Sequence, residues 1–189
     1  PQIKRVDFPY PDLPPGLEGL LIAQLSDVHI GPTLDRTFMQ TLVDQVNQLS
    51  ADLVVITGDL VDGSVEQLAP HVAPLQGLRS RYGTFFCAGN HESYWNEGAW
   101  NAHLQGLGVT VMENNHVLLE RQGATLLLAG VPDMRTHGPG SSPAQAVRTH
   151  ELVGLKVLLA HQPQSCEEAH KAGVDLQLSG HTHAGQFYP

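Results

Sequence analysis

Short clusters of carboxylate, amide and imidazole side chains recur along this sequence, and each one follows an apolar run. Such groups are the ligands that hold divalent transition metals in proteins. Residues two apart at the end of a strand project to the same side, so a pair at that spacing can chelate one centre. The clusters are Asp27-Val28-His29, Gly58-Asp59, Gly89-Asn90-His91-Glu92, His161 and Gly180-His181-Thr182-His183.

The stretch from Gly89 to Trp95, GNHESYW, has three interpretations. It could be a turn with polar decoration, a metal site, or the helix of a zinc protease. The protease motif needs a second histidine four positions after the first, and position 95 is a tryptophan, so this interpretation is excluded. The stretch alone does not separate the other two.

Each cluster has an ordinary structural explanation when it is taken singly. An Asp-x-His pair is most often a turn, Gly-Asp is a common dipeptide, and a lone His161 is most often a core histidine. All the clusters nevertheless fall where a predicted strand ends, and the other strand ends carry none. Sites in open α/β sheets form outside the carboxyl ends of the strands, so the coincidence favours one shared site.

The candidate ligands are three oxygen donors and four imidazoles, which is more than one tetrahedral zinc takes and too poor in sulfur for a structural zinc site. The set suits two divalent transition metals that share a bridging carboxylate, about 3.5–4 Å apart. Imidazole favours zinc, iron, manganese or nickel over calcium or magnesium. The candidates are Asp27, Asp59, Asn90, His29, His161, His181 and His183.

Apolar runs predict the strands that position these clusters, at 20–25, 53–57, 82–88, 155–160 and 174–178. Leu34, Phe38, Leu42, Val46 and Leu49 form a stripe at helical spacing after the first run, and further helices are predicted around 99–107 and 165–172. Between them, turn signals separate three short strand candidates, 109–112, 116–120 and 124–129. This spacing predicts an antiparallel meander.

Composition limits the class of protein. The 189 residues fit one domain, predicted over 1–189 with native N-terminal and C-terminal segments missing from the sequence. Ten Lys plus Arg against nineteen Asp plus Glu give a net charge of −9, which argues against nucleic-acid binding. No run approaches the ~20 apolar residues of a membrane span. We expect membrane association if an N-terminal anchor precedes Pro1, and a cytoplasmic protein otherwise.

The clusters, in this order, resemble the calcineurin-like metallophosphoesterase family from Leu20 onward. The similarity is to the branch of transmembrane proteins with a metallophosphoesterase domain and bacterial membrane-associated phosphodiesterases, in which runs like Leu158 to Pro163 and Asp175 to Pro189 recur. The resemblance implies a four-layer α/β/β/α sandwich with two mixed sheets and a dinuclear metal site at the carboxyl ends of the strands. It also implies two divalent metals, of manganese, zinc or iron.

The resemblance assigns a role to each residue. Asp59 bridges the metals, and a metal-bridging hydroxide attacks phosphorus. His91 is a non-ligand histidine that gives a proton to the leaving alkoxide, and Asp62 orients it; alternatively, Asp62 is only a turn residue before a helix. Glu92 is expected to hold the loop. One metal takes Asp27, His29, Asp59 and His183, and the other takes Asp59, Asn90, His161 and His181.

The implied function is hydrolysis of a phosphodiester or pyrophosphate bond. Asp62 is followed by Gly63 and Ser64, so the arginine that protein phosphatases of the family carry is missing, which argues against a phosphoprotein substrate. The alternatives are a phosphomonoesterase or nucleotidase, a more distant exonuclease, and a non-catalytic metal-binding scaffold. The intact ligand set and His91 argue against the scaffold.

Aromatic residues beside the catalytic stretch bear on the substrate. Tyr94 and Trp95 follow His91 after two intervening residues. Amphipathic rings suit a membrane interface or an acyl-bearing substrate. The membrane-associated branch that the sequence resembles implies, as one expectation, a lipid-linked phosphodiester or a UDP-diacylglucosamine-type pyrophosphate as substrate, with peripheral or tethered membrane association. Packing of the loop is the alternative for both rings, and core packing explains Trp100. The predicted loop at the rim of the site carries Met134, Arg135 and His137.

Overall fold

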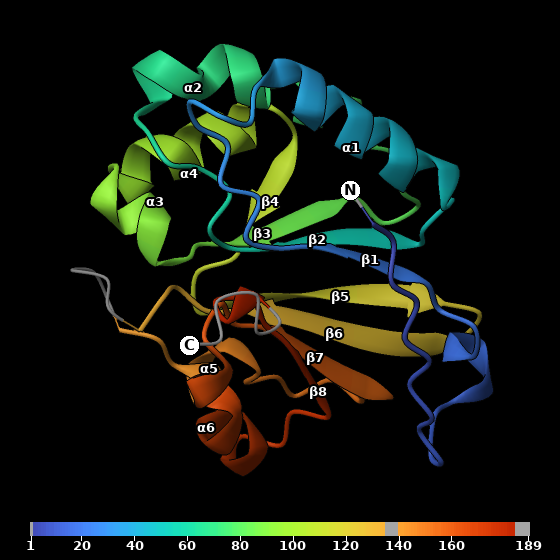
Figure 1. Cartoon of the computed structure of the whole chain (residues 1–189). Helices are drawn as coiled ribbons and strands as arrows, with labels where there is room; N and C mark the ends of the chain where they lie inside the picture. Colours follow the sequence, from blue (N-terminus) through green and yellow to red (C-terminus); the bar gives the residue numbers. More distant parts are fainter. Residues whose placement is uncertain (1, 135–139, 184–189) are drawn as a thin grey trace.

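A computed structural model describes residues 2–134 and 140–183 as two four-stranded sheets that pack face to face with helices outside them. Figure 1 shows the four layers in order, with α1, α2 and α4 above the first sheet and α5 and α6 below the second. The predicted four-layer α/β fold is confirmed.

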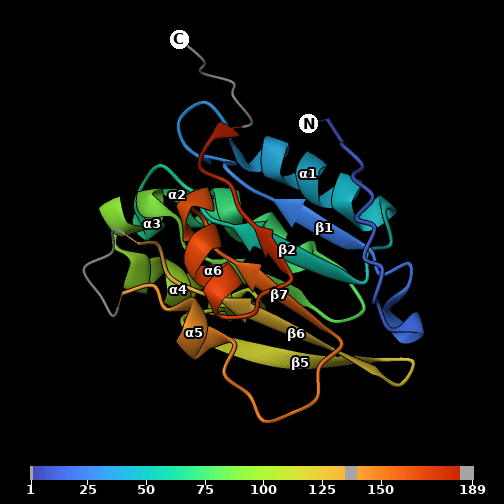
Figure 2. The same ribbon diagram turned by 90° about the horizontal axis from the view of Figure 1, so that it is seen from below.

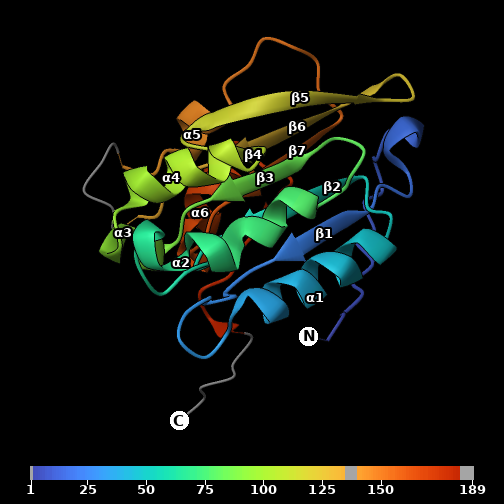
Figure 3. The same ribbon diagram turned by 90° about the horizontal axis from the view of Figure 1, so that it is seen from above.

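The first sheet has the order β1-β2-β3-β4, and all its pairings are parallel. Helices connect its first strands and lie over its outer face, as the view from above shows (Figure 3). Its elements are η1 (Pro15–Leu17), β1 (Ile22–Leu25), α1 (Arg36–Gln48), β2 (Leu53–Thr57), α2 (Val65–Val72), η2 (Ala73–Gly77), β3 (Thr84–Cys87), α3 (Asn90–Tyr94), α4 (Glu97–Gly106) and β4 (Val109–Val111).

The second sheet has the order β5-β6-β7-β8, in which β5 pairs antiparallel with β6 and the other pairings are parallel. The view from below shows α5 and α6 across its outer face (Figure 2). Its elements are β5 (Asn115–Arg121), β6 (Ala124–Gly130), α5 (Pro143–Ala146), β7 (Leu155–Leu159), η3 (Pro163–Ser165), α6 (Cys166–Lys171) and β8 (Leu176–Leu178).

Two details of the predicted sheets differ from the structure. Only the second sheet is mixed, whereas the first is parallel throughout the described residues. The predicted meander of three strands is wrong at its first member, because β4 pairs in parallel with β3 and belongs to the other sheet. β4 follows α4, so it completes a strand-helix-strand crossover, and such units place their strands in parallel.

Alternation along β2 explains why its sequence is apolar without interruption. Val54 and Ile56 pack against the helices α1, α2 and α4, whereas Leu53 and Val55 face the second sheet. A strand covered on both faces has no solvent side on which polar residues would be favoured. The polar residues are therefore displaced to the strand end, where Gly58 and Asp59 follow.

Helix positions follow from local signals as well as from burial. The Asp35 carboxylate accepts hydrogen bonds from the backbone N–H groups of Thr37 and Phe38 and so caps α1. Pro70 lies within α2 and is followed after two residues by the 3-10 turn η2, because proline disfavours continuation of a regular helix. Within the described residues, no helix is both long and apolar enough to span a bilayer.

Candidate metal centre

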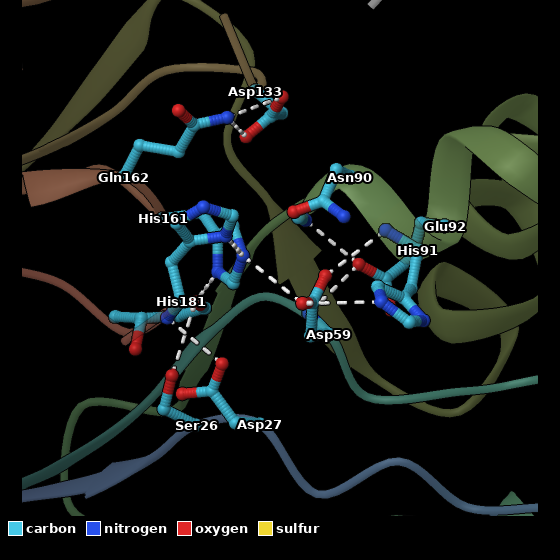
Figure 4. A network of polar contacts seen from close by, with 12 residues as sticks. Ser26, Asp27, Asp59, Asn90, His91, Glu92, Asp133, His161, Gln162 and His181 are labelled. Atoms are coloured by element: carbon cyan, nitrogen blue, oxygen red, sulfur yellow. Dashed lines mark hydrogen bonds and ion pairs between the residues drawn. The ribbon is translucent and has the colours of Figure 1, made fainter. Parts of the chain in front are cut away.

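The predicted ligands from both sheets converge at one edge of the molecule. β1, β2 and β3 of the first sheet and β7 and β8 of the second each end beside it, and Figure 4 shows several of the side chains facing one another across this space. Every residue predicted from the sequence to bind metal lies within the described residues. The arrangement has two halves.

The first half consists of Asp27, His29 and His183, whose ligand atoms lie within 4.8 Å of one another. Nε2 of His29 lies 3.1 Å from Nε2 of His183, and that atom of His183 lies 3.6 Å from Oδ1 of Asp27. Two imidazole nitrogens and a carboxylate oxygen that point at one space are suited to hold a divalent metal.

The second half consists of Asp59, His161 and His181, which satisfy the same 4.8 Å limit. Nε2 of His161 lies 3.1 Å from Oδ2 of Asp59 and 3.2 Å from Nδ1 of His181. Asp59 also reaches toward the first half, because its Oδ2 lies 3.9 Å from Nε2 of His29. Its carboxylate therefore lies between the two groups, where a bridging ligand has to be.

Asn90 provides a test of whether a metal fits. Its side chain is buried, and its Oδ1 has no hydrogen-bond partner in the part of the chain that the structure describes. An unsatisfied buried amide oxygen costs about 1–3 kcal/mol unless something else pairs with it. A metal ion beside Asp59 and His161 would supply that partner, so the donor set fits the implied group.

His161 and Asp59 shift each other's pKa. Its Nδ1 lies 2.7 Å from the carbonyl oxygen of Thr57 and must donate to it, because a carbonyl only accepts. Burial lowers the pKa of His161, but the Asp59 carboxylate opposes this and leaves the pKa raised. Burial likewise raises the pKa of Asp59, and the bonds from His161 and the His91 backbone outweigh it, so that pKa is lowered. A metal ion held by both groups would take the place of a proton between Nε2 of His161 and Oδ2 of Asp59.

Strained backbone occurs at several of the predicted ligands. A non-glycine residue with positive φ is uncommon and costs of order 1–3 kcal/mol, and such residues cluster at functional sites. Among the described residues nine non-glycine residues have positive φ, and more than half of them are predicted ligands. These are Asp27 (φ 51°), His29 (50°), Asp59 (51°), His181 (70°) and His183 (49°).

Glycines ahead of the ligands provide space. A Cβ on Gly89 would overlap the Asp59 carboxylate, and a Cβ on Gly180 would overlap Ser26 and lie 2.5 Å from Oδ2 of Asp27. Gly58 also has φ of 85°, which favours glycine. Because these glycines have no Cβ, separate loops come close enough for their side chains to bind the same metal ion.

His91 and Asp62, predicted as catalytic, lie together beside the metal ligands. Nδ1 of His91 lies 2.5 Å from Oδ1 of Asp62, and its Nε2 lies 3.9 Å from Oδ2 of Asp59. His91, His29 and Asp59 also fall within 4.8 Å of one another, so the distances alone permit His91 as a ligand. The carboxylate of Asp62 contacts both His29 and His91, as its predicted orienting role requires, and that role stays a prediction.

Glu92 is the buried support of this loop. Its carboxylate accepts hydrogen bonds from the backbone N–H groups of Asp59 (3.0 Å), Leu60 (2.7 Å), Val61 (3.3 Å) and Gly89 (2.7 Å). Burial raises the pKa of Glu92 to about 7, although those hydrogen bonds oppose the rise. Glu92 lies in α3, so it ties the Gly89 turn and the short helix after β3 to the loop after β2.

Asp133 and Gln162 are a buried pair that the sequence analysis missed. The Gln162 amide donates to both carboxylate oxygens of Asp133, at 3.0 and 2.8 Å, next to the predicted ligand His161 (Figure 4). Asp133 lies three residues beyond β6, so the expectation that the other strand ends carry no polar ligand-type residue is wrong there. The place of Asp133 just after an apolar run was the sequence signal that could have identified it. Of the predicted rim loop, Met134 is 44% exposed, and Arg135 and His137 lie outside the described residues.

Comparisons with known proteins agree with this geometry. A bovine transmembrane protein with metallophosphoesterase domain is 40% identical over 203 residues, covering 100% of this chain and 46% of that protein. An uncharacterized metallophosphoesterase of Helicobacter pylori is 38% identical over 176 residues, covering 90% of this chain and 46% of that protein. The chain thus spans about half the length of these relatives.

A solved structure shows the same fold. The NAD nucleotidase of Haemophilus influenzae superposes with a TM-score of 0.63 at 17% identity, covering 87% of this chain and 43% of that one. The model of the calcineurin-like phosphoesterase family matches residues 20–185. The two ligand groups lie in that range, and members of this family use two divalent metals. The chain therefore belongs to the calcineurin-like phosphoesterase family of metal-dependent phosphoester hydrolases.

Proposed function

We propose that this domain hydrolyses a phosphodiester or pyrophosphate bond at two divalent metals. One observation carries the proposal: the imidazole of His91, whose Nε2 faces the Asp59 carboxylate, is held at the edge of a double cluster of candidate metal ligands by the carboxylate of Asp62. A structural metal site has no need of a partly exposed histidine beside it, and the His91 side chain is 32% exposed.

The chain supplies a full ligand set for both ions. Asp27, His29 and His183 would hold one, Asn90, His161 and His181 would hold the other, and Asp59 would contact both. When bound, two such metals supply an activated water as nucleophile and offset the negative charge that gathers on phosphorus in the transition state.

His91 would deliver the proton that the leaving oxygen needs. A carboxylate only accepts hydrogen bonds, so Asp62 keeps the Nδ1 of His91 protonated and turns Nε2 toward Asp59 and the substrate. Histidine carries a proton near neutral pH and can release it to a developing alkoxide. The backbone N–H of His91 donates to Oδ1 of Asp59 at 3.0 Å, which fixes the acid relative to the bridging ligand.

The substrate is proposed to carry an apolar part, such as a lipid-linked phosphodiester or a nucleotide-sugar lipid pyrophosphate of the UDP-diacylglucosamine type. Tyr94 and Trp95 support this, because they are 65% and 42% exposed and the Tyr94 ring lies 5.5 Å from the ring of His91. Groups that flank the acid would contact the leaving group. The bovine relative's name places a domain of this kind in a transmembrane protein, which agrees with a substrate at a membrane.

The proposed function is tested with metal-reconstituted protein on matched substrates. Protein loaded with Mn²⁺ is given bis-p-nitrophenyl phosphate, p-nitrophenyl phosphate and a nucleotide-sugar pyrophosphate, and the Asp59→Asn variant serves as the control for contaminating phosphatases. We expect turnover of the diester or the pyrophosphate above that of the monoester. Preference for the monoester would support a nucleotidase instead, and full metal loading without turnover would support a scaffold.

A further inference from the structure

One carboxylate oxygen serves two histidines at the edge of the cluster. Oδ1 of Asp62 lies 3.0 Å from Nδ1 of His29 and 2.5 Å from Nδ1 of His91. The two rings meet edge to face, with centroids 4.5 Å apart. His29 is a predicted metal ligand and His91 is the predicted acid. The same oxygen atom therefore contacts a residue of metal binding and a residue of proton transfer.

The backbone holds Asp62 in this place. Its N–H donates to the carbonyl of Ile30 at 2.8 Å, which extends the pairing of β1 and β2 beyond their ends. A Cβ on Gly31 would lie 3.3 Å from the Cβ of Asp62, so the glycine leaves room for that approach. The indole N–H of the fully buried Trp100 donates to the carbonyl of Gly63 at 3.0 Å and anchors the following residue.

The chemistry of the carboxylate decides how both rings are oriented. Because an ionised carboxylate can only accept, both Nδ1 atoms must carry hydrogen. With hydrogen on its Nδ1, His29 turns its Nε2 into the first ligand group, 3.1 Å from Nε2 of His183. A carboxylate on the far nitrogen of a ligating histidine fixes the tautomer and raises the basicity of the ligand.

We propose that Asp62 is a positioning residue for the metal ligand His29 as well as for His91, so that one carboxylate couples the strength of the first metal site to the placement of the acid. The inference rests on the proposed metal centre. The inference predicts that substitution of Asp62 weakens metal binding even when His91 is not involved.

The experiment measures Mn²⁺ binding rather than turnover. In a His161→Ala background, the Asp27-His29-His183 group remains intact, and Mn²⁺ affinity is measured by equilibrium titration with and without Asp62→Asn. We expect Asp62→Asn to weaken binding by roughly 10–100-fold, as removal of such outer partners does. His91→Ala in the same background should bind as the background does. In a His29→Ala background, Asp62→Asn should cause no further loss.

The possible results separate the inference from the proposed function. If Asp62→Asn leaves Mn²⁺ affinity unchanged in the His161→Ala background, Asp62 serves His91 alone and the inference is overturned. If it weakens binding equally in the His29→Ala background, the effect does not pass through His29, and the inference is overturned as well. If the unsubstituted domain binds no Mn²⁺, the proposed metal centre and the inference are both overturned. If it binds two ions but Asp62→Asn leaves the Mn²⁺ affinity unchanged, only the inference is overturned. Thermal unfolding in EDTA checks the fold, and Asp62→Ser replaces Asp62→Asn if that variant does not fold.

Discussion

Nε2 of His161 lies 3.1 Å from Oδ2 of Asp59, and both side chains are buried almost completely. The other nitrogen of the same imidazole is taken by the carbonyl of Thr57. This contact places a carboxylate from the first sheet against an imidazole from the second, so the site exists only when the two sheets pack together. Asp59 is also the residue that reaches the ligands of both halves.

The bridging position of Asp59 gives the first prediction. Asp59→Asn should lower metal occupancy at both sites, because a neutral amide cannot offset the charge of two dications. His29→Ala should affect mainly one site, since His29 belongs to the first group. Metal analysis by mass spectrometry after gel filtration checks this. Two full equivalents of metal in Asp59→Asn would rule out the bridging role.

His91 should separate chemistry from metal binding. His91→Ala should keep both metals and lose roughly 10²–10⁴-fold in rate on diesters with poor leaving groups. The loss should be smaller with p-nitrophenolate, which leaves without a proton. His170→Ala, which changes an exposed histidine on α6, is the control. Loss of a metal together with His91 would instead make this histidine a ligand, and an equal rate loss on both kinds of substrate would argue against the acid.

Gly89 should be intolerant of a methyl group for reasons of space. Gly89→Ala should displace the Asp59 carboxylate, lower metal occupancy at both sites, and destabilise the fold by about 1–3 kcal/mol, as overpacking does. Gly106→Ala on α4 is the matched control, because nothing lies within 4 Å of its added Cβ, and it should be neutral or stabilising by about 0.4–1 kcal/mol. Equal metal content and unfolding midpoints for the two variants would contradict the crowding.

The metal-free protein should become less stable as pH rises. The pKa of Glu92 is raised from 4.5 to about 7, and that of His161 is raised above 6.5, so the folded state holds protons that the unfolded state releases. Stability therefore falls as pH rises from 4.5 through about 7. The lowered pKa of Asp59 acts only below 3.8, so it does not oppose this trend.

Thermal unfolding measures this trend in EDTA at several pH values. The midpoint should fall from about pH 5 to about pH 7.5, and Glu92→Gln should flatten the slope. Stabilisation by added Mn²⁺ should change in the opposite direction, because metal binds the deprotonated ligands. A midpoint that rises with pH in EDTA would contradict the assignment.

The exposed aromatic residues test the lipid proposal. Tyr94→Ala with Trp95→Ala should lower activity on a lipid-linked substrate in detergent far more than activity on a small soluble diester. Trp100→Phe is the contrasting change, because Trp100 is fully buried and should affect both substrates through stability alone. If the two activities of the double variant fall in parallel, the rings pack the loop and the lipid proposal loses its support.

The sequence alone was enough to predict which residues would gather and which strands would bring them there. β2 is apolar on both faces because helices cover one side and the second sheet covers the other, and this leaves Gly58 and Asp59 conspicuous at its end. The same logic holds for β3 before Asn90 and β7 before His161. The spacing of apolar residues and the points where an apolar run ends in polar residues are local properties of the chain. Both can be seen in the sequence directly.

The tertiary structure decided which side chains meet. His29 and His183 are 154 positions apart, and no pattern within a segment reports that their Nε2 atoms face each other. β4 has the short alternating pattern of its neighbours, so only pairing with β3 places it in the first sheet. The contact of Asp62 with both His29 and His91 likewise depends on the packing of three loops. Contacts between distant segments depend on how the sheets and helices pack, and local sequence patterns carry no record of that packing.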